Sequence, residues 1–554
     1  MRRTSLALSV FVLAATACGV FGTDGESSSS SSGGGSSSGG KPPEETSKPP
    51  GVDGKPLEGI FVSQTKGNDA TGDGSMAKPL ATLAAGLAKG QKDRQRVLVC
   101  AETYNEQVTW LDGVSAYGYF DCQGPEWKLD ETRRARVQSP KSPALKAEAI
   151  NQPTRIEGFE IVAPDLGEGS PDEREPLQNS SIAAFVKGSS ALTISKSTLK
   201  AGKGRDGVDG TNPPPLVRVD DRAPQIGVNE TLCTASAACT VAHAGQAGGL
   251  GGQAHCDAAP PGVSQPGPGG AGGDGGHWDG GFGGTLLSAV GERTSPTPGL
   301  PTSATPGTAK GGALLPPLNG NVFIAGFNGD TGATGASGTD GVNGVAVLSE
   351  SGFAPGDGTR GTSGAGGQGG GGGAGQTFRA GMDTHNQGAS GGGGGAGGCP
   401  GLAGEPGLGG GASLGLLVVQ SDLSLERVTI TSSKGGRAGV GTLGSLSTDG
   451  QSGAAGGVPR PVGTACTDAG GNPVNCTGAV GGNGGAGGRA GVSGHGAAGP
   501  SLALVHFGAA PRMSADTVLT PGEGGDGAPR VQAGAAVIPE SPKGASEKIV
   551  KAGQ

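Results

Sequence analysis

The chain has 554 residues, of which 118 are glycine and 39 are proline, and hydrophobic residues make up 33%. This composition excludes one thick globular core, and because aromatic residues are only 3%, it favours a narrow core of small aliphatic side chains. The formal net charge of −8, without any basic block, excludes the phosphate-neutralising surface that nucleic-acid binding requires.

Residues 1–17 have the layout of a secretory signal peptide. Two arginines precede an apolar run from Leu6 to Ala15, and small residues follow. The run is too short to span a bilayer as a permanent anchor. The sequence therefore predicts export.

The cysteine that follows, Cys18 in AATAC, resembles the bacterial lipobox, although Ala15 stands where that family usually has Leu. The resemblance implies cleavage before Cys18 and lipidation of its thiol and amine. Gly19 stands where the family's inner-membrane retention signal has Asp, which implies an outer-membrane, cell-surface address. An ordinary secretion signal with a chance cysteine is the alternative.

Residues 18–57 begin with Cys18 and contain, from Thr23 to Lys55, a tract of serine, glycine and proline without apolar periodicity, which is too polar to fold. Such a tract behaves as a flexible coil, and roughly 35 residues would span about 30 to 35 Å. We interpret it as a tether between the lipid and a folded body.

From Gly59 the pattern predicts a strand at Ile60–Val62, a turn-rich loop, and a helix from Leu80 to Ala88. The stretch GNDATGDGSMAKPLATL resembles the opening of pectate-lyase-like right-handed β-helix proteins, where a short helix caps the first rung. A surface loop before an α/β unit is the alternative. In the same region Tyr117, Tyr119 and Phe120 are interpreted as core packing, with a saccharide-stacking platform as the second interpretation.

A repeat organises the rest of the chain. Residues 181–210 recur at 413–439 and, in a worn form, at 501–527, with apolar and polar residues alternating as in strands. One such unit cannot bury its apolar face alone, so the copies are expected to stack as rungs. The predicted segments are N-terminal rungs 58–210, a glycine-rich insertion 211–412, a rung 413–433, a second insertion 434–500, and a last rung with the C-terminal tail 501–554.

The expected fold class is therefore all-β: a right-handed single-stranded parallel β-helix with long glycine-rich loop insertions and a short N-terminal capping helix. This combination resembles glycine-rich PGRS-like myxobacterial surface lipoproteins, for which no activity is agreed. The resemblance consequently implies an architecture and no catalytic residue.

The insertions contain seven glycines at intervals of three, from Gly326 to Gly344. This spacing is typical of collagen, but no proline occupies the intervening positions, so polyglycine-like or irregular packing is the alternative. Asp274 and Asp526 lie among glycines, which leaves calcium as a candidate cofactor, although tandem nonapeptide spacing is missing. No other cofactor is expected.

Eight cysteines remain besides Cys18, an even number in an exported chain. Proximity predicts Cys100–Cys122 and Cys466–Cys476, and pairs Cys233 with Cys239 or Cys256, leaving Cys399 to the remaining cysteine. Zinc is the rival interpretation. There is no CxxC pair, and His243, His255 and His277 are expected in loops without ligand spacing.

The family that the opening resembles includes polysaccharide lyases, in which carboxylates hold calcium and an Arg or Lys abstracts a proton. The candidate groups here are Arg218, Asp220, Asp221 and Arg222, or Arg155, Glu157 and Glu160. Glu157 and Glu160 are three positions apart and should face opposite sides of a strand. GVSGHG at 491–496 has the GxSxG form but lies in low-complexity sequence. We assign no catalytic residue.

Two function classes follow. The first is a non-catalytic surface lipoprotein that displays glycine-rich loops for adhesion, cell contact or envelope structure, with polysaccharide or surface proteins as partners. The second is an extracellular polysaccharide lyase or glycoside hydrolase. An enzyme needs acidic and basic groups along one groove, whereas a scaffold does not.

Overall fold

The structure is a computed structural model that describes residues 57–124, 126–167, 177–229, 247–273, 327–375, 389–458 and 477–553, and the bounds of a few short strands between these ranges. The described residues belong to one compact unit, Thr46–Gln554. They are almost entirely β, with the helix α1 (Leu83–Asp93) near the start.

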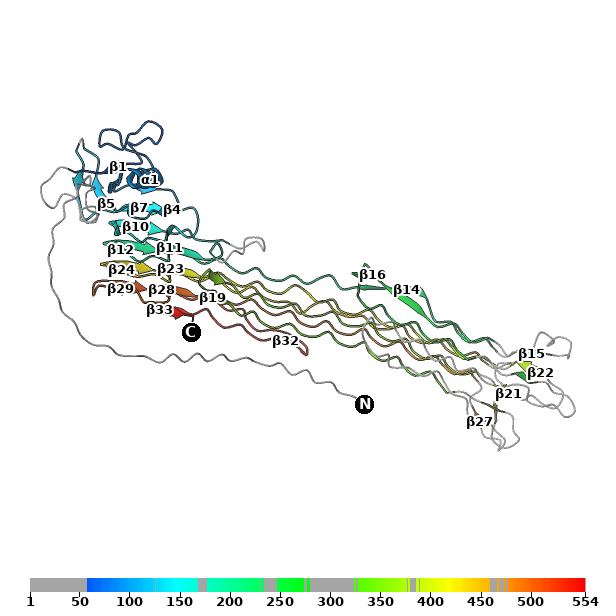
Figure 1. Ribbon diagram of the computed structural model, residues 1–554. Coiled ribbons are helices and arrows are strands. Elements are labelled where there is room, and N and C mark those ends of the chain that lie inside the picture. The colour runs from blue at the N-terminus through cyan, green and yellow to red at the C-terminus, as the bar shows by residue number, and fades with distance from the viewer. Residues whose placement is uncertain are drawn as a thin grey trace, which may run out of the picture. The chain divides into compact units, whose positions relative to one another are not determined.

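Three parallel sheets form the body of this unit (Figure 1). The first contains β1 (Ile60–Val62), β2 (Val97–Cys100), β5 (Ala116–Asp121), β9 (Thr154–Glu157), β12 (Leu192–Ser195), β24 (Leu423–Glu426) and β29 (Arg512–Met513), with β6 (Lys128–Leu129) antiparallel to β5. The second contains β3 (Thr103–Tyr104), β7 (Ala135–Gln138), β10 (Phe159–Val162), β13 (Thr198–Lys200), β25 (Thr429–Thr431) and β30 (Val518–Thr520). The third contains β4 (Val108–Trp110), β8 (Leu145–Glu148), β11 (Ser181–Lys187), β23 (Ser413–Val419), β28 (Ser501–Phe507) and β33 (Ser546–Ala552).

The chain visits the three sheets in rotation, one strand from each per circuit, from β4 onward. The sequence repeats are successive circuits: Ser181 pairs with Ser413, and Ser413 with Ser501, in parallel register. Ile194 likewise pairs with Leu425, although the whole first insertion lies between them in the chain. The predicted all-β class and the predicted stacking of the repeats are confirmed.

The core inside the circuits is aliphatic. Ile156, Ile194 and Leu425 follow one another in register and are almost fully buried. Leu83 and Leu87 of α1 are fully buried in the same cluster. The predicted helix at Leu80–Ala88 is shifted, because Leu80 bridges to Val62 and the Thr82 hydroxyl accepts a hydrogen bond from the Ala85 amide as the N-cap.

The corners between strands recur at equivalent places. Gly158, Lys196 and Arg427 directly follow successive strands of the first sheet, and all three have positive φ, at 78°, 41° and 56°. A Cβ at Gly158 would lie 2.4 Å from Cδ1 of Tyr119, so glycine is required there by contact as well as by conformation. The corner geometry is thus fixed by the stack and not by one residue type.

The glycine-rich segments are ordered by hydrogen bonds that repeat every three residues. The amides of Gly329, Gly332 and Gly335 donate to the carbonyls of Val480, Asn483 and Ala486, and the series continues to Gly344 and His495. A three-residue period is that of the polyproline II helix. The bonds join segments of one chain, so the polyglycine-like alternative is confirmed for these residues, and the collagen and irregular alternatives are wrong. Gly326 lies outside the described residues.

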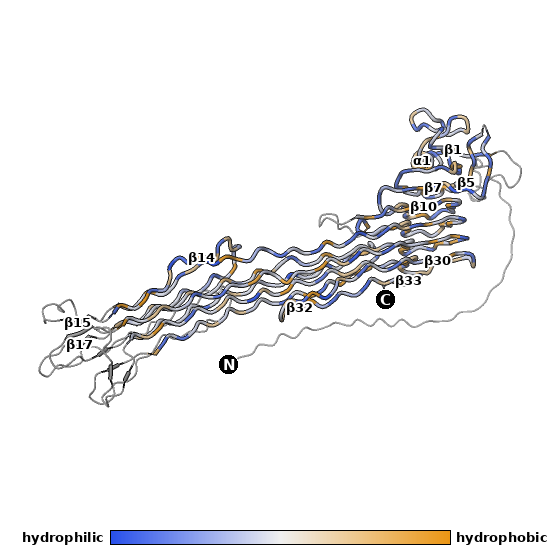
Figure 2. Tube along the Cα trace, turned by 180° about the vertical axis from the view of Figure 1, so that it is seen from behind, coloured by the Kyte–Doolittle hydropathy of each residue, from blue (hydrophilic) through white to orange (hydrophobic). Residues whose placement is uncertain are grey.

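One segment, 389–404, forms the centre of this bundle and is buried throughout. Gly395 and Gly398 donate to Gly482 and Gly485 on one side, and their carbonyls accept from Gly370 and Gly367 on another. In Figures 1 and 2 the segments run beside one another, with long pale stretches of intermediate hydropathy. Backbone contact replaces a hydrophobic core here.

Polar side chains complete the bundle at its edges. Asn328, Asp340 and Asn343 accept hydrogen bonds, each 2.9 Å long, from the amides of Val480, Val492 and His495. Asp206, Asp209 and Asn212 do the same for Arg437, Val440 and Gly444. These side chains satisfy the amides that the glycine pattern leaves unpaired.

Short antiparallel ladders decorate the insertions and the C-terminal part. They are β14 (Val217–Arg222) with β16 (Gln253–Asp257), β15 (Thr231–Cys233) and β17 (His277–Trp278) with β22 (His385–Gln387), β18 (Phe323–Ile324) with β21 (Thr377–Phe378), β19 (Val347–Ser349) with β20 (Gly352–Ala354), β26 (Cys466–Thr467) with β27 (Pro473–Val474), and β31 (Val531–Ala533) with β32 (Ala536–Ile538).

Gly335→Ala should loosen the bundle, because the new Cβ would lie 2.1 Å from the backbone carbonyl oxygen of Ala365. We expect amide hydrogen exchange of residues 327–345 and 359–374, followed by mass spectrometry, to show at least about tenfold weaker protection. Ala336→Ser, at the exposed neighbouring position, is the control and should leave protection unchanged. Equal protection in both variants would contradict close packing at Gly335.

Candidate functional site

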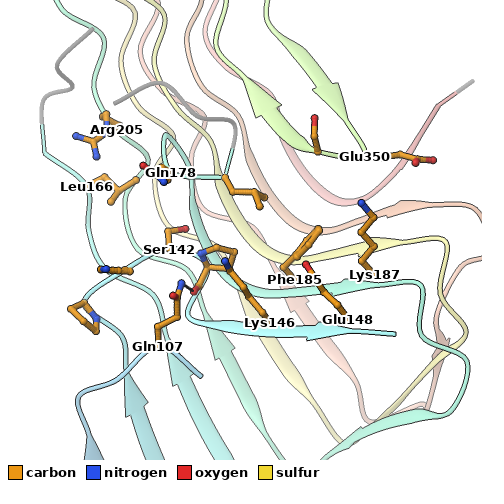
Figure 3. A pocket seen from close by; sticks show the side chains of 15 residues that line it. Gln107, Ser142, Lys146, Glu148, Leu166, Gln178, Phe185, Lys187, Arg205 and Glu350 are labelled. Carbon is orange, nitrogen blue, oxygen red and sulfur yellow. Dashed lines mark hydrogen bonds between the residues drawn. The ribbon is translucent and has the colours of Figure 1, made fainter. Parts of the chain in front are cut away.

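A groove of about 780 Å³ lies on the outer side of the third sheet. β8 and β11 form one wall and the hairpin β19–β20 contributes Glu350 and Ser351 (Figure 3). Phe185 and Phe353 pack together beneath the hairpin and fix it to the sheet. The lining residues are Gln107, Pro140, Lys141, Ser142, Pro143, Lys146, Glu148, Leu166, Leu177, Gln178, Phe185, Lys187, Arg205, Glu350 and Ser351.

Four of these lining residues are cationic, namely Lys141, Lys146, Lys187 and Arg205, and two are carboxylates, Glu148 and Glu350. Lys146 and Lys187 lie on adjacent strands, and Lys187 is the register partner of Glu148. The Glu350 carboxylate accepts a hydrogen bond from Gln420 Nε2 at 2.8 Å. None of the described carboxylates lies within 4.0 Å of the ammonium groups of Lys141, Lys146 or Lys187.

The candidate cluster around Glu157 is closed to solvent. The fully buried Glu157 carboxylate contacts Arg155 Nε at 2.5 Å and Lys196 Nζ at 2.9 Å, while Lys196 also reaches Glu131 at 2.6 Å. Burial raises the pKa of Glu157, but the bonds and charges of Arg155 and Lys196 outweigh it, so the pKa lies below its ordinary value. This network pairs the buried carboxylate with two cations of the same chain and stabilises the sheet.

Glu160 does not share a strand with Glu157, so the expectation that they face opposite sides of one strand is wrong. Glu157 ends β9 in the first sheet, the corner at Gly158 follows, and Glu160 lies in β10 of the second sheet. Glu160 is paired with Lys200 at 2.6 Å and with Arg136 at 3.2 Å. Each of the two carboxylates is thus paired with cations of its own sheet.

The second candidate set lies on the exposed strand β14. Arg218 pairs with Asp220 at 2.8 Å, and both Nε and Nη2 of Arg222 donate to the Gly251 carbonyl. Asp221 contacts Nδ1 of His255 at 2.8 Å, across the β14–β16 ladder. His255 was expected in a loop but lies in β16, and sequence spacing gave no sign of this pair. His243 and the side chain of His277 lie outside the described residues.

The GVSGHG segment belongs to the glycine bundle. The buried Ser493 hydroxyl donates to the Gly404 carbonyl at 2.7 Å and accepts from the Gly361 amide. His495 is also buried, its Nδ1 accepts from the Gly441 amide, and burial lowers its pKa. Both side chains serve packing, which agrees with a chance match to GxSxG.

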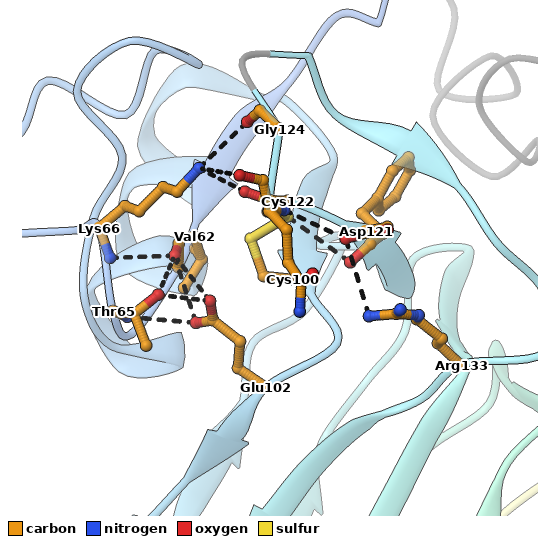
Figure 4. The surroundings of a disulfide bond; sticks show 12 residues. Val62, Thr65, Lys66, Cys100, Glu102, Asp121, Cys122, Gly124 and Arg133 are labelled. Atoms are coloured by element: carbon orange, nitrogen blue, oxygen red, sulfur yellow. Dashed lines mark hydrogen bonds and ion pairs between the residues drawn. A yellow bond between two sulfur atoms is a disulfide. The ribbon is translucent and has the colours of Figure 1, made fainter.

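The aromatic group near the first disulfide is core packing. Tyr117, Tyr119 and Phe120 are fully buried, together with Trp127, around the Cys100–Cys122 disulfide. Burial raises the pKa of both tyrosines well above the ordinary value. Figure 4 shows Lys66 beside this disulfide, where its ammonium donates to the carbonyls of Cys122 and Gly124. The saccharide-stacking alternative is wrong, because no ring face is exposed.

Two predicted cysteine pairings can be assessed. Cys100–Cys122 is confirmed, and Cys256–Cys399 is the bridge obtained if Cys233 pairs with Cys239. Cys18, Cys239 and Cys476, and the side chains of Cys233 and Cys466, lie outside the described residues, as does Asp274. Asp526 pairs with Lys434 at 2.7 Å. Within the described ranges, no three His, Cys, Asp or Glu side chains gather as metal ligands would.

No family model, curated protein or solved structure matches the chain. In the part of the chain that the structure describes, no helix combines the length and hydropathy that a bilayer span requires. The groove residues Lys141, Lys146 and Lys187 were not singled out by the sequence patterns. The sequence analysis predicted the strand that carries Lys187, within residues 181–210, but it predicted no strand at Leu145–Glu148, which carries Lys146.

Glu157→Gln should destabilise the chain by about 3 kcal/mol at pH 7, because it leaves Arg155 and Lys196 without their buried carboxylate. The pKa of Glu157 is depressed in the folded state, so its contribution is present above its ordinary value of 4.5 and is lost as pH falls through the folded-state pKa. Urea unfolding at several pH values should therefore show the difference from wild type shrinking in acid.

Glu131→Gln is the matched control, since Glu131 contacts the same lysine but its side chain is 51% exposed. We expect a change within about 1 kcal/mol. Equal effects of the two substitutions on the free energy of unfolding would contradict the claim that the buried ion pairs of Glu157 stabilise the fold more than the exposed pair of Glu131.

Proposed function

We propose that the chain is a non-catalytic, lipid-anchored cell-surface protein whose sheet circuits carry a packed glycine-rich bundle for adhesion, cell contact or envelope structure. The observation that carries this proposal is the burial of segment 389–404 inside hydrogen-bonded neighbours. Insertions built in this way present a fixed outer surface, as a scaffold requires. The charged residues that they contribute on β14 and β16, Arg218 with Asp220 and Asp221 with His255, pair with one another within the chain.

We further propose that the sheets form a right-handed single-stranded parallel β-helix, as in pectate-lyase-like proteins and in PGRS-like surface lipoproteins. The rotation of the chain through three parallel sheets supports a β-helix. The handedness follows from the general preference of crossovers between parallel strands, about 98% of which are right-handed.

The proposed cellular location rests on the sequence alone. Residues 1–17 would be removed, Cys18 would be lipidated, and residues 18–57 would tether the body to the outer membrane. A tether of roughly 30 to 35 Å would place the body clear of the lipid headgroups.

Metabolic labelling with a palmitate analogue tests this address. The wild-type chain should be labelled and should sediment with outer membranes, and protease added to intact cells should degrade it. Cys18→Ser should abolish the label and release the chain, since the acyl chains supply the membrane affinity. Ser29→Ala, in the tether, is the control. Labelled Cys18→Ser, or full protection from protease, would contradict the proposal.

A second candidate function is an extracellular polysaccharide lyase or hydrolase. The groove over the third sheet favours it, because Lys146, Lys187 and Glu148 place cations and a carboxylate along one concave surface. An enzyme of this class needs such a groove, whereas a plain scaffold does not need one.

Incubation of the full chain, purified in detergent, with a panel of uronate-containing polysaccharides separates the two functions. For a scaffold we expect no rise in absorbance near 235 nm from unsaturated products, and no new reducing ends. A sustained signal that depends on protein concentration would replace the scaffold with the enzyme. Heat-denatured chain is the control.

A further inference from the structure

Ion pairs join several outward charges of the first and second sheets. Glu160 lies between Arg136 and Lys200, and Arg155 joins Glu157 to Glu426 at 2.5 and 2.7 Å. In the bundle, Lys434 pairs with Asp526 and Arg437 with Asp209. Pairing of neighbouring charges within the chain is thus common on these surfaces.

The groove over the third sheet departs from that pattern. Lys141, Lys146 and Lys187 converge on it, and no described carboxylate lies within 4.0 Å of their ammonium groups. Glu148, beside Lys187, and Glu350, held by Gln420, balance only part of the positive charge. Cations gathered without partners in a concavity provide electrostatic attraction for an anion.

The shape and chemistry of the groove select the kind of anion. A volume of about 780 Å³ admits a narrow chain, and exposed Gln178 and Ser351 offer amide and hydroxyl groups that suit sugar hydroxyls. A membrane surface fits poorly, because a flat surface cannot enter a groove. In addition, the net charge of −8 on the whole chain would repel an anionic membrane. A sugar chain bearing negative groups meets both conditions.

We propose that this groove binds an acidic glycan, with Lys146 and Lys187 contacting its carboxylate or phosphate groups and Lys141 flanking them. The inference rests on the proposed surface function and names its partner class. It differs from the enzymatic alternative, because it requires retention of an intact chain and no cleavage.

Binding of the full chain in detergent is measured by isothermal titration with an alginate oligomer, a phosphomannan fragment and neutral dextran. We expect binding to at least one acidic glycan, none to dextran, and an affinity that falls as salt rises from 0.05 to 0.5 M, because added ions screen the lysine charges. Alginate and phosphomannan distinguish carboxylate from phosphate as the recognised group.

Lys146→Glu and Lys187→Glu should each weaken binding by at least about tenfold, since each reverses one contacting charge. Lys548→Glu, on the exposed strand β33 outside the groove, is the matched control and should change affinity less than about twofold. Circular dichroism of each variant shows that folding is kept. Lys146→Gln and Lys187→Gln, which keep a polar side chain, should give intermediate losses.

Two results would overturn the inference. One is equal binding of the groove variants and the control. The other is dextran binding as tight as alginate binding. If the wild-type chain is lipidated and surface-exposed but binds no acidic glycan, the proposed binding in the groove is refuted and the proposed surface function is kept. If the chain cleaves the glycan, the proposed non-catalytic function is refuted.

Discussion

Backbone contact at every third residue is the constraint on which the larger part of this molecule depends. Where one glycine-rich segment passes another, the carbonyl of the neighbour lies where a Cβ would be, as at Gly335 and Ala365. Omitting the side chain lets the amide donate directly to the next backbone at 2.7 to 2.9 Å in the series from Gly329 to Gly344. Many such bonds bury segment 389–404 with almost no aliphatic side chains, so hydrogen-bond satisfaction does the work that hydrophobic burial does in the sheets.

The three parallel sheets form the other part of the molecule. They tolerate the insertions because the strands before and after an insertion still pair in register. Ile194 and Leu425 are neighbours in one ladder whether or not the intervening chain leaves the coil. The corners at Gly158, Lys196 and Arg427 keep the same left-handed conformation even though only one of them is glycine. The stack therefore imposes local geometry on unlike residues, and insertions leave and return without disturbing it.

Sequence patterns predicted the parts of the fold that depend on local periodicity. The alternation in residues 181–195 and 413–426 gave the paired strands, and the triplet spacing from Gly326 pointed to three-residue helices. The start of α1 was misplaced, because the bridge between Leu80 and Val62 is a tertiary contact without a local signal. Likewise, nothing near Asp206 reveals that its side chain accepts the Arg437 amide from 231 positions away.

The candidate site was less predictable than the fold, because pairing of charges is decided by neighbours in space. Glu157 was one of the candidate carboxylates in the sequence, although no catalytic residue was assigned, and in the structure Arg155 and Lys196 pair with it. Lys146 and Lys187 looked like ordinary surface residues, and only the stacking of β8 on β11 beside the β19–β20 hairpin brings them into one groove. Composition could say how many charges exist but not which of them lack a partner.

The triplet ladder between residues 329–344 and 480–495 also limits how such a gene can change length. Losing or gaining three residues moves each glycine onto the next equivalent carbonyl, whereas a change of one or two residues puts a side chain against a neighbouring backbone. Within the bundle, tolerated insertions and deletions should therefore come in units of nine nucleotides, and drift in segment length becomes a stepwise process.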